Sequence, residues 1–263
     1  MGLVCSQIVN TRCAFAMHWR NKSQRMFVPP ALILFLLIVS SPVKSQSQQA
    51  TPDSSREIAR DSRYPAHWWK AVSKEGAPAW EILPQEARAG EVILSKRNEL
   101  GLLSNFAATP FRFKGKRYAS LEGFWQMMKY PEGPNDRRAK FPGLDWKYTR
   151  AQVAQLTSFA AKNAGTLAEE NMKKMGIGWV TFQGKRIEYR PETPGEHYRL
   201  IMAATRAKVR QNPEVRKVLL ATGNLILKPD HHQGPTPPAA WRYYEILTQI
   251  RGELQKRFSN NSI

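Results

Sequence analysis

The stretch Ser120–Lys129 constrains the fold most, because its residues separate into two faces when it is read as a helix. Apolar side chains recur there at spacings of three and four residues, and Glu122, Gln126 and Lys129 form a polar stripe beside them. Ser120 is a suitable N-cap, which places Glu122 in the first turn next to unpaired backbone amides. A carboxylate held there among aromatic side chains can be tuned as an acid or a base. On spacing alone, the simpler interpretation is an amphipathic helix with a solvated polar face.

The pattern of the remaining sequence, after the N-terminal segment, predicts a mostly helical α+β single domain with short strands and hairpins and no internal repeat. A strand is expected over 91–95, and hairpins over 110–119 and 179–190, turning at Lys114-Gly115 and Gln183-Gly184. Gly165 is expected to end a helix over 149–164, and Thr166-x-x-Glu169 to cap a second helix that runs to about residue 175. Further helices are expected over 196–211, from 213 towards Gly223, and over 239–256, with a strand at 225–228. The aromatic segment 64–80 is expected to pack onto this domain.

The first 45 residues have the pattern of an export signal. They contain five basic residues, no acidic residue and the apolar run Ala31–Val39, which is too short to span a bilayer comfortably. We expect a signal peptide over 1–45, a flexible linker over 46–63, a catalytic domain over 64–258 and a tail over 259–263. The protein would then be periplasmic or secreted, with no stable membrane association after cleavage. The alternatives are an uncleaved anchor, or a cytoplasmic protein whose true start is Met17 or Met26.

The composition favours one class of binding partner and excludes several classes of catalytic site. The net charge of +19 favours anionic partners such as phosphates, nucleotides or nucleic acid. Both cysteines lie in the first 13 residues, so the body has no thiol nucleophile, and it has no P-loop, dinucleotide-binding glycine motif or nucleophile elbow. His231-His232 has no cysteine partner, so no metal site is predicted there. The pair either lies in a solvated loop or, with Asp230 before it, contacts a substrate.

Three stretches, in order along the chain, resemble the NADAR (YbiA-like) family of N-glycosidases. They are Leu102–Phe106, Tyr118–Lys129, and Arg206–Pro213 running into Leu219–Gly223. The resemblance covers about residues 91–256 and implies a hydrolase that cleaves a C–N glycosidic bond. The implied substrates are phosphorylated ribosylamine intermediates of riboflavin synthesis or ADP-ribose attached to guanine, including ADP-ribosylated nucleic acid. Gly123 stands where the family often has histidine, and the family's Asp-x-x-Trp-Gly loop is not reproduced.

The resemblance makes Glu122 the catalytic residue. Its carboxylate would stabilise an oxocarbenium-like ribosyl cation and activate water, which requires no cofactor and no metal. The residues that the resemblance and the surrounding basic charge suggest for substrate binding are Arg97, Asn105, Phe106, Trp125, Gln126, Lys129 and Asp230.

These residues have different expected roles. Asn105 would hydrogen-bond the ribose or base, and Phe106 or Trp125 would stack on a ring, although a turn asparagine and core aromatics explain them equally well. Gln126 would orient Glu122 or the substrate. Lys129 would pair with a phosphate or attack an opened ribose aldehyde as an amine.

For the remaining two positions, Arg97 is the preferred phosphate ligand among the basic residues 96, 97, 114, 116 and 117, and Asp230 is a second acid or ribose ligand. A solvated face is the simpler explanation of the basic group. A second function also fits the sequence: a non-catalytic, basic nucleotide- or nucleic-acid-binding module on the same fold.

Overall fold

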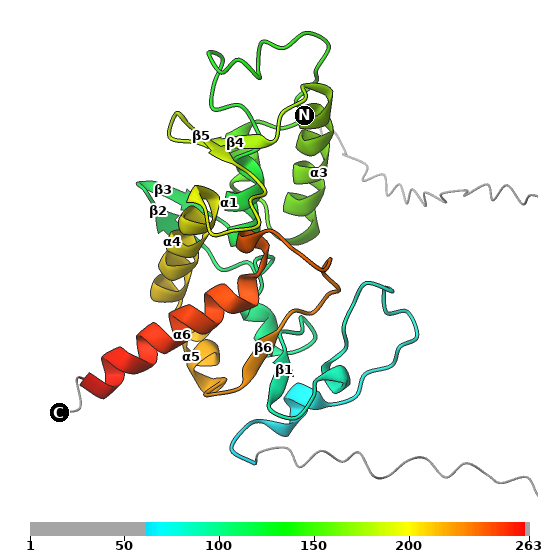
Figure 1. The fold of residues 1–263 in the computed structure, drawn as a ribbon, viewed down its shortest axis with the longest axis vertical. Coiled ribbons are helices and arrows are strands. Elements are labelled where there is room, and N and C mark those ends of the chain that lie inside the picture. The colour runs from blue at the N-terminus through cyan, green and yellow to red at the C-terminus, as the bar shows by residue number, and fades with distance from the viewer. Residues whose placement is uncertain (1–61, 261–263) are drawn as a thin grey trace, which may run out of the picture. The chain divides into compact units, whose positions relative to one another are not determined.

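The computed structural model describes residues 62–260 (Figure 1). The predicted signal peptide and all but the last two residues of the predicted linker lie outside this part. Within it, no helix is both long and apolar enough to cross a membrane.

Three two-stranded sheets carry all the strands of the described part. Strand β1 (Glu91–Ile93) pairs in parallel with β6 (Ile226–Lys228), which brings together segments far apart in the sequence. Strands β2 (Phe111–Phe113) and β3 (Lys116–Tyr118) form one antiparallel hairpin, and β4 (Trp179–Phe182) and β5 (Lys185–Glu188) form another. Both hairpins turn through two residues with positive φ, Lys114-Gly115 and Gln183-Gly184, as the sequence predicts.

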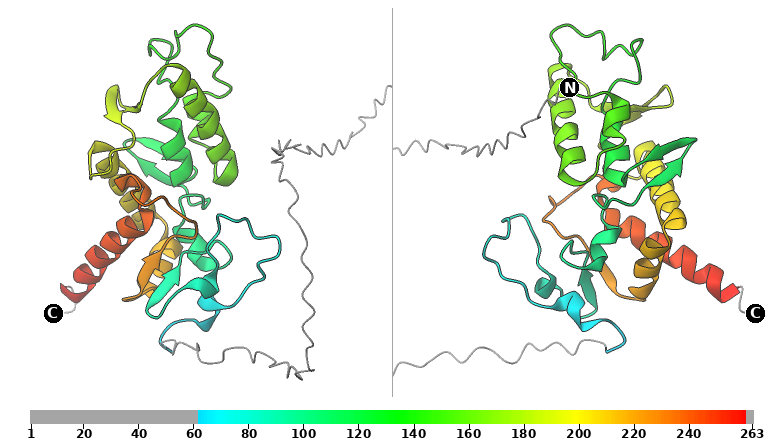
Figure 2. Two further views of the ribbon diagram at one scale, coloured as in Figure 1. Left: turned by 45° about the vertical axis from the view of Figure 1, so that its right-hand side comes forward. Right: turned by 180° about the vertical axis from the view of Figure 1, so that it is seen from behind.

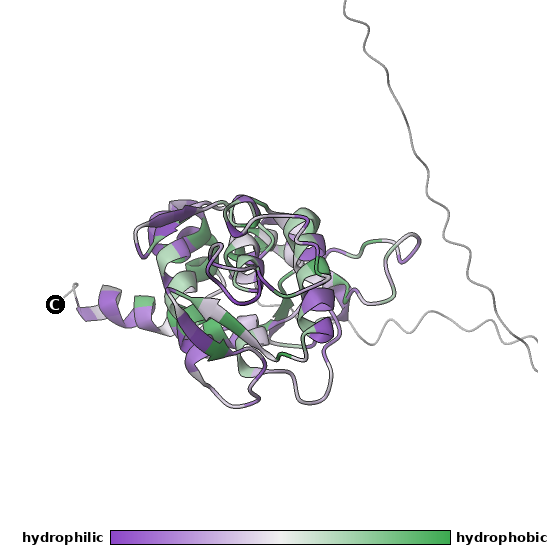
Figure 3. Cartoon of the chain, turned by 90° about the horizontal axis from the view of Figure 1, so that it is seen from above, coloured by the Kyte–Doolittle hydropathy of each residue, from purple (hydrophilic) through white to green (hydrophobic). Residues whose placement is uncertain are grey.

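Helical residues outnumber strand residues in the described part, and the mixture of helices with short strands confirms the α+β prediction. The helices are α1 (Leu121–Met127), α2 (Arg150–Val153), α3 (Ser158–Lys174), α4 (Glu196–Gln211), α5 (Pro213–Ala221) and α6 (Tyr243–Asn260). Short 3-10 turns lie at η2 (Ala66–Trp69), η3 (Pro84–Glu86), η4 (Glu99–Leu103) and η5 (Ala239–Trp241). Figure 2 shows α1 and α3 side by side from two further directions. Figure 3 shows that α6 becomes predominantly hydrophilic toward its C-terminal end.

Helix α1 lies at the centre of an aromatic cluster that joins it to both hairpins. The ring of Phe124 lies 4.9 Å from that of Tyr118 in β3 and 5.6 Å from that of Phe182 in β4, in edge-to-face arrangements. Phe113 of β2 stacks on Phe182 at 6.2 Å. Trp68 and Trp69 are buried as well, which confirms that the aromatic segment packs onto the domain, whereas Trp80 is half-exposed. Burial on both sides therefore holds α1 in one orientation.

The predicted helices over 149–164 and 166–175 are wrong in their boundaries. The chain forms the single turn α2, leaves the helical conformation, and starts α3 at Ser158, whose φ is 52°. Helix α3 then runs through Gly165 without a break, and the Thr166 hydroxyl donates to the Lys162 carbonyl inside the helix, so it is not an N-cap. In α3 the Phe159 side chain lies at the surface and is 54% exposed, whereas the helix expected over 149–164 would have counted it among its buried residues.

Two other boundaries differ by a few residues. Helix α1 ends at Met127, and the following two residues form a turn. The predicted helix over 239–256 is divided into η5 and α6, because Arg242 has a ψ of 59° that no α-helix accommodates. The last helix extends beyond its predicted end, to Asn260.

Candidate functional site

The first turn of α1 is held from outside the helix. The Ser120 hydroxyl accepts from the amide of Gly123 at 2.9 Å and donates to the carbonyl of Leu156 at 2.8 Å. The Glu122 amide, which has no partner within the helix, donates to the carbonyl of Asn105 at 2.9 Å. These hydrogen bonds join the start of α1 to two other segments, the Leu-Ser-Asn-Phe turn and the α2–α3 connection.

Gly123 is required by this close packing. A β-carbon added there would lie 2.5 Å from the carbonyl oxygen of Leu156 and 3.0 Å from that of Val153, both backbone atoms. A histidine following Glu122 would force the α2–α3 connection away from α1. The glycine therefore reflects local packing in this chain, and it leaves the position of the Glu122 backbone intact.

The polar stripe of α1 is buried, so the solvated amphipathic helix is excluded. Glu122 is 5% exposed, Gln126 4% and Lys129 1%. Helix α3 covers this face, and a buried carboxylate requires a partner, since its desolvation is costly. That partner is Gln126, whose side-chain amide donates to the Glu122 carboxylate at 2.7 Å.

Gly165 of α3 makes room for the pair. A β-carbon at this position would lie 1.8 Å from Oε1 of Gln126. This oxygen is buried and has no hydrogen-bond partner among residues 62–260. The absence of a side chain at Gly165 is what lets Gln126 lie beneath Glu122.

The environment raises the pKa of Glu122. Burial is the largest cause, and it outweighs the hydrogen bond from Gln126 and the positive charges of Lys162, Lys129 and Lys96. A buried carboxyl group with a raised pKa and nearby cations is a typical arrangement for an acid–base catalyst. The three lysines also show which surfaces approach the carboxylate, because they come from α3, from the end of α1 and from the segment after β1.

A second carboxylate lies at the carboxyl ends of the parallel strands. Lys96 follows β1 and Asp230 follows β6, and the two side chains form an ion pair. Asp230 is 4% exposed, and it also accepts from the Tyr243 hydroxyl at 3.0 Å and contacts Nδ1 of His231 at 3.0 Å. Burial opposes its ionisation, but the hydrogen bond from His231 and the charge of Lys96 outweigh it and lower its pKa. The side chain of His231 is partly exposed and lies parallel to the Tyr243 ring, 6.0 Å away.

Aromatic rings and exposed cations lie around these carboxylates. Nζ of Lys96 lies 5.2 Å from the ring centre of Phe106, and Phe106 meets Phe159 of α3 edge-to-face at 5.2 Å. Asn105 and Phe106 are partly exposed, and Lys162 of α3 is exposed. Phe159 and Lys162 were not among the predicted site residues, because only the register of α3 brings them here. His231, which the sequence placed either in a solvated loop or against a substrate, contacts Asp230.

Other predicted site residues point elsewhere. Lys129 donates to the Glu169 carboxylate at 3.0 Å and to the Gly165 carbonyl at 3.2 Å, and burial lowers its pKa despite the charge of Glu169. Trp125 donates to the Tyr189 hydroxyl at 3.1 Å inside the core. Arg97 forms a two-point pair with Glu81, with both distances 2.7 Å.

The three stretches that carry the family resemblance meet in space. Lys208, from the third stretch, donates to the carbonyl of Ser104, in the first, at 2.7 Å. The next residue, Asn105, accepts from the amide of Glu122 in the second. Lys208 is fully buried, so it secures the Leu-Ser-Asn-Phe turn from behind. No group of three or more histidine, cysteine or acidic side chains within the described residues could hold a metal ion.

Comparisons with known proteins add a distant similarity. No protein-family model matches the sequence, and no curated protein matches it. Among solved structures, the chain is similar to the NMR structure of the E. coli protein YbiA, with 22% identity and a TM-score of 0.40. The match covers 65% of this chain and 89% of that one. A similarity this distant assigns no activity to the chain.

Proposed function

We propose that this protein is a hydrolase that cleaves the N-glycosidic bond of a ribosyl or ADP-ribosyl substrate, with Glu122 as its catalytic carboxylate. The observation that carries the proposal is the Glu122 carboxylate itself. It is buried at the start of α1, held by Gln126, and approached by the cations Lys96 and Lys162 beside the Asn105–Phe106 turn. The family resemblance of the same stretches supports the same role.

In the proposed reaction, the bond between the ribose C1′ and the base or amine nitrogen breaks, and its electron pair stays on the nitrogen. The sugar becomes an oxocarbenium-like cation, which the Glu122 carboxylate stabilises by its charge. Water adds at C1′ and its proton passes to Glu122; Glu122 then releases a proton to solvent and the leaving nitrogen takes one up from solvent, so that the sugar gains OH and the nitrogen gains H. The raised pKa of Glu122 suits this role, because a more basic carboxylate accepts the proton more readily.

The surrounding side chains fit an anionic, ring-containing substrate. Lys96 and Lys162 supply positive charge beside Glu122, and Phe106 and Phe159 offer partly exposed rings for stacking. Asp230, which Lys96 and His231 keep ionised, is placed to accept hydrogen bonds from ribose hydroxyls. In this proposal Lys96 takes the phosphate-binding role that the sequence favoured for Arg97, because the charge of Lys96 acts on Glu122, whereas Arg97 is directed to Glu81. The mechanism uses no cofactor and no metal.

The test is Glu122→Gln, which keeps the shape of the side chain and removes its charge. We expect turnover to fall by about 10²–10⁴-fold, the usual contribution of a general acid or base, while folding and substrate binding persist. The substrates to assay are ADP-ribosylated guanosine, NAD and phosphorylated ribosylamine intermediates, with release of the base or amine measured by chromatography. Glu170→Gln is the matched control, because Glu170 is an exposed residue of α3 that should not affect turnover.

The outcomes separate the enzyme from the alternative binding module. Equal turnover by the wild type and by Glu122→Gln would remove Glu122 from the mechanism. If the wild type binds these compounds and releases no product from any of them, the non-catalytic module is favoured. Loss of turnover in Glu170→Gln as well as in Glu122→Gln would show that the assay reports folding and not chemistry.

A further inference from the structure

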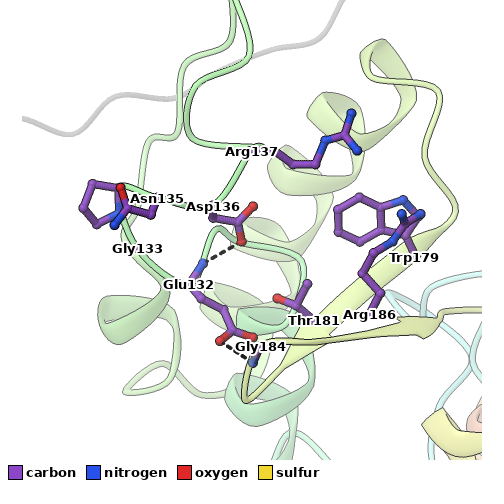
Figure 4. Close-up of a pocket in the computed structure, with 10 residues that line it drawn as sticks. Glu132, Gly133, Asn135, Asp136, Arg137, Trp179, Thr181, Gly184 and Arg186 are labelled. Carbon is purple, nitrogen blue, oxygen red and sulfur yellow. Dashed lines mark hydrogen bonds between the residues drawn. The ribbon is translucent and has the colours of Figure 1, made fainter.

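A cleft of about 440 Å³ lies between the loop after α1 and the β4–β5 hairpin (Figure 4). Glu132–Arg137 form one wall, and Trp179, Thr181 and Arg186 form the other. None of its lining residues belongs to the site around Glu122, so the proposed hydrolase does not account for it.

The hairpin wall presents an arginine stacked on a tryptophan. Trp179 and Thr181 are two residues apart on β4 and therefore point to the same face of the hairpin. Arg186 on β5 pairs with Thr181, so its side chain points to that face as well. The guanidinium of Arg186 lies 4.2 Å from the ring centre of Trp179. An arginine stacked in this way has lost most of its side-chain freedom, but its N–H groups remain available at the edge of the plane. Figure 4 shows Arg137 extending from the loop toward Trp179.

The two acidic residues of the cleft form ion pairs with arginines outside its lining, so two arginines of the cleft have no acidic partner. Asp136 is engaged by Arg138, which is buried, through a two-point contact. Glu132 accepts from the Gly184 amide at 2.9 Å and lies 3.5 Å from Arg150. Both acids are therefore matched by cations of their own.

Arg137 and Arg186, by contrast, have no acidic partner anywhere in residues 62–260, and both are exposed. The two acids of the cleft lining are paired with Arg138 and Arg150, which lie outside the lining, so this group of two acids and four arginines has a net charge of +2. The two unpaired charges belong to arginine, the side chain whose planar fork matches the oxygens of a phosphate. A phosphate group held between them would gain hydrogen bonds from both sides without displacing an existing ion pair.

We propose that this cleft binds the phosphodiester backbone of a single-stranded nucleic acid, with Arg186 and Arg137 as the phosphate ligands. The neighbouring hairpin favours a polymer over a small phosphate compound. The β2–β3 hairpin carries Lys114 in its turn and Lys116 and Arg117 on β3, and all three are exposed and have no acidic partner in the described part of the chain. The contact of Phe113 with Phe182 places this hairpin beside β4, and Figures 1 and 2 show both hairpins projecting to the same side. A strand seated in the cleft can continue over these cations.

The test measures binding of a fluorescently labelled oligothymidine to the full chain by anisotropy, over a series of KCl concentrations. We expect Arg137→Ala/Arg186→Ala to weaken binding by about tenfold or more at low salt, and the slope of log K against log salt to fall by about 0.7 for each arginine removed. Arg88→Ala is the matched control, because Arg88 is an exposed arginine outside the cleft. Its effect should be no more than that of one unit of net charge.

Arg186→Lys separates the built site from charge alone, since lysine keeps the charge but lacks the fork and the stacking plane. We expect it to weaken binding nearly as much as Arg186→Ala. Wild-type affinity in Arg186→Lys, or equal losses in Arg88→Ala and the double variant, would overturn the proposal. So would displacement of the oligonucleotide by inorganic phosphate beyond the effect of matched KCl, because the ligand would then be a small anion. Glu122→Gln should bind the oligonucleotide like the wild type, which keeps this test independent of the proposed hydrolase.

Discussion

Gly165→Ala tests whether α3 supports the candidate catalytic carboxylate. In an ordinary helix interior this substitution stabilises a protein by up to about 1 kcal/mol, because alanine loses less backbone entropy on folding. Here the new β-carbon would lie 1.8 Å from Oε1 of Gln126 and 2.3 Å from its Cδ. The Gln126 side chain must therefore move, and it is the group that hydrogen-bonds Glu122.

The expected size of the effect follows from these competing contributions. Losing a hydrogen bond to a charged group costs about 1.5–3 kcal/mol. Overpacking a well-filled site costs about 1–3 kcal/mol. The two losses together, reduced by the gain of up to about 1 kcal/mol in helix propensity, lower the free energy of unfolding by about 1.5–5 kcal/mol. Turnover should fall as well, because Glu122 loses the contact that orients it.

Urea unfolding monitored by tryptophan fluorescence gives the free energies. Gly252→Ala is the matched control, since Gly252 lies inside α6 and an added β-carbon meets no atom within 4 Å. It should be neutral or stabilising. A double variant, Gly165→Ala with Gln126→Ala, removes the clashing atoms and should be more stable than the sum of the two single effects predicts. If Gly165→Ala proves as stable as Gly252→Ala, α3 does not hold Gln126 against Glu122 as described.

Two further predictions concern pH. Burial alone would raise the pKa of Asp136, but hydrogen bonds from Arg138 lower it from 3.8 to about 2, so its stabilising contribution is present above pH 3.8 and is lost as the pH falls toward 2. Asp136→Asn should therefore be least stable relative to wild type above this window, as urea unfolding at a series of pH values would show. Burial lowers the pKa of Lys208 from 10.5 to about 7, so the unfolded chain binds more protons between these values and stability should rise with pH there. Lys208→Met should flatten that rise, and an unchanged slope would contradict the assignment.

Local signals in the sequence predict most of the elements. The hairpins were predictable because a two-residue turn with glycine at its second position determines both the strand ends and the pairing. The helix boundaries within 149–175 were not predictable, because Gly165 and Thr166 have the pattern of a helix end followed by an N-cap. Thr166 instead bonds within α3, and the role of Gly165 depends on a neighbour from another part of the chain. Gly165 is small because Gln126 lies against it, and no local pattern records that contact.

The sequence singles out one residue of the candidate site, Glu122, and says less about what surrounds it. Glu122 could be singled out from its position after the Ser120 cap and from the resemblance, and the structure places Asn105 and Gln126 against it. Burial of the polar stripe could not be foreseen, since periodicity separates two faces without showing which partner covers the polar one. Lys96 and Arg97 are adjacent in sequence and equal in charge, so only the strand pairing shows that Lys96 meets Asp230.

Glu122 and Asp230 differ in the direction of their pKa shifts because they differ in their direct contacts with charged groups. The charge of Lys96 lowers the pKa of both Glu122 and Asp230, and both side chains are buried. Asp230 nevertheless has a lowered pKa, because the ion pair and the contact with His231 reach it directly. Glu122 has one hydrogen bond from a neutral amide and only more distant charges, so burial prevails and its pKa rises. In the proposed hydrolase, acids separated in this way would have different roles: Asp230, with its lowered pKa, would bind the ribose as a carboxylate, and Glu122, with its raised pKa, would exchange a proton.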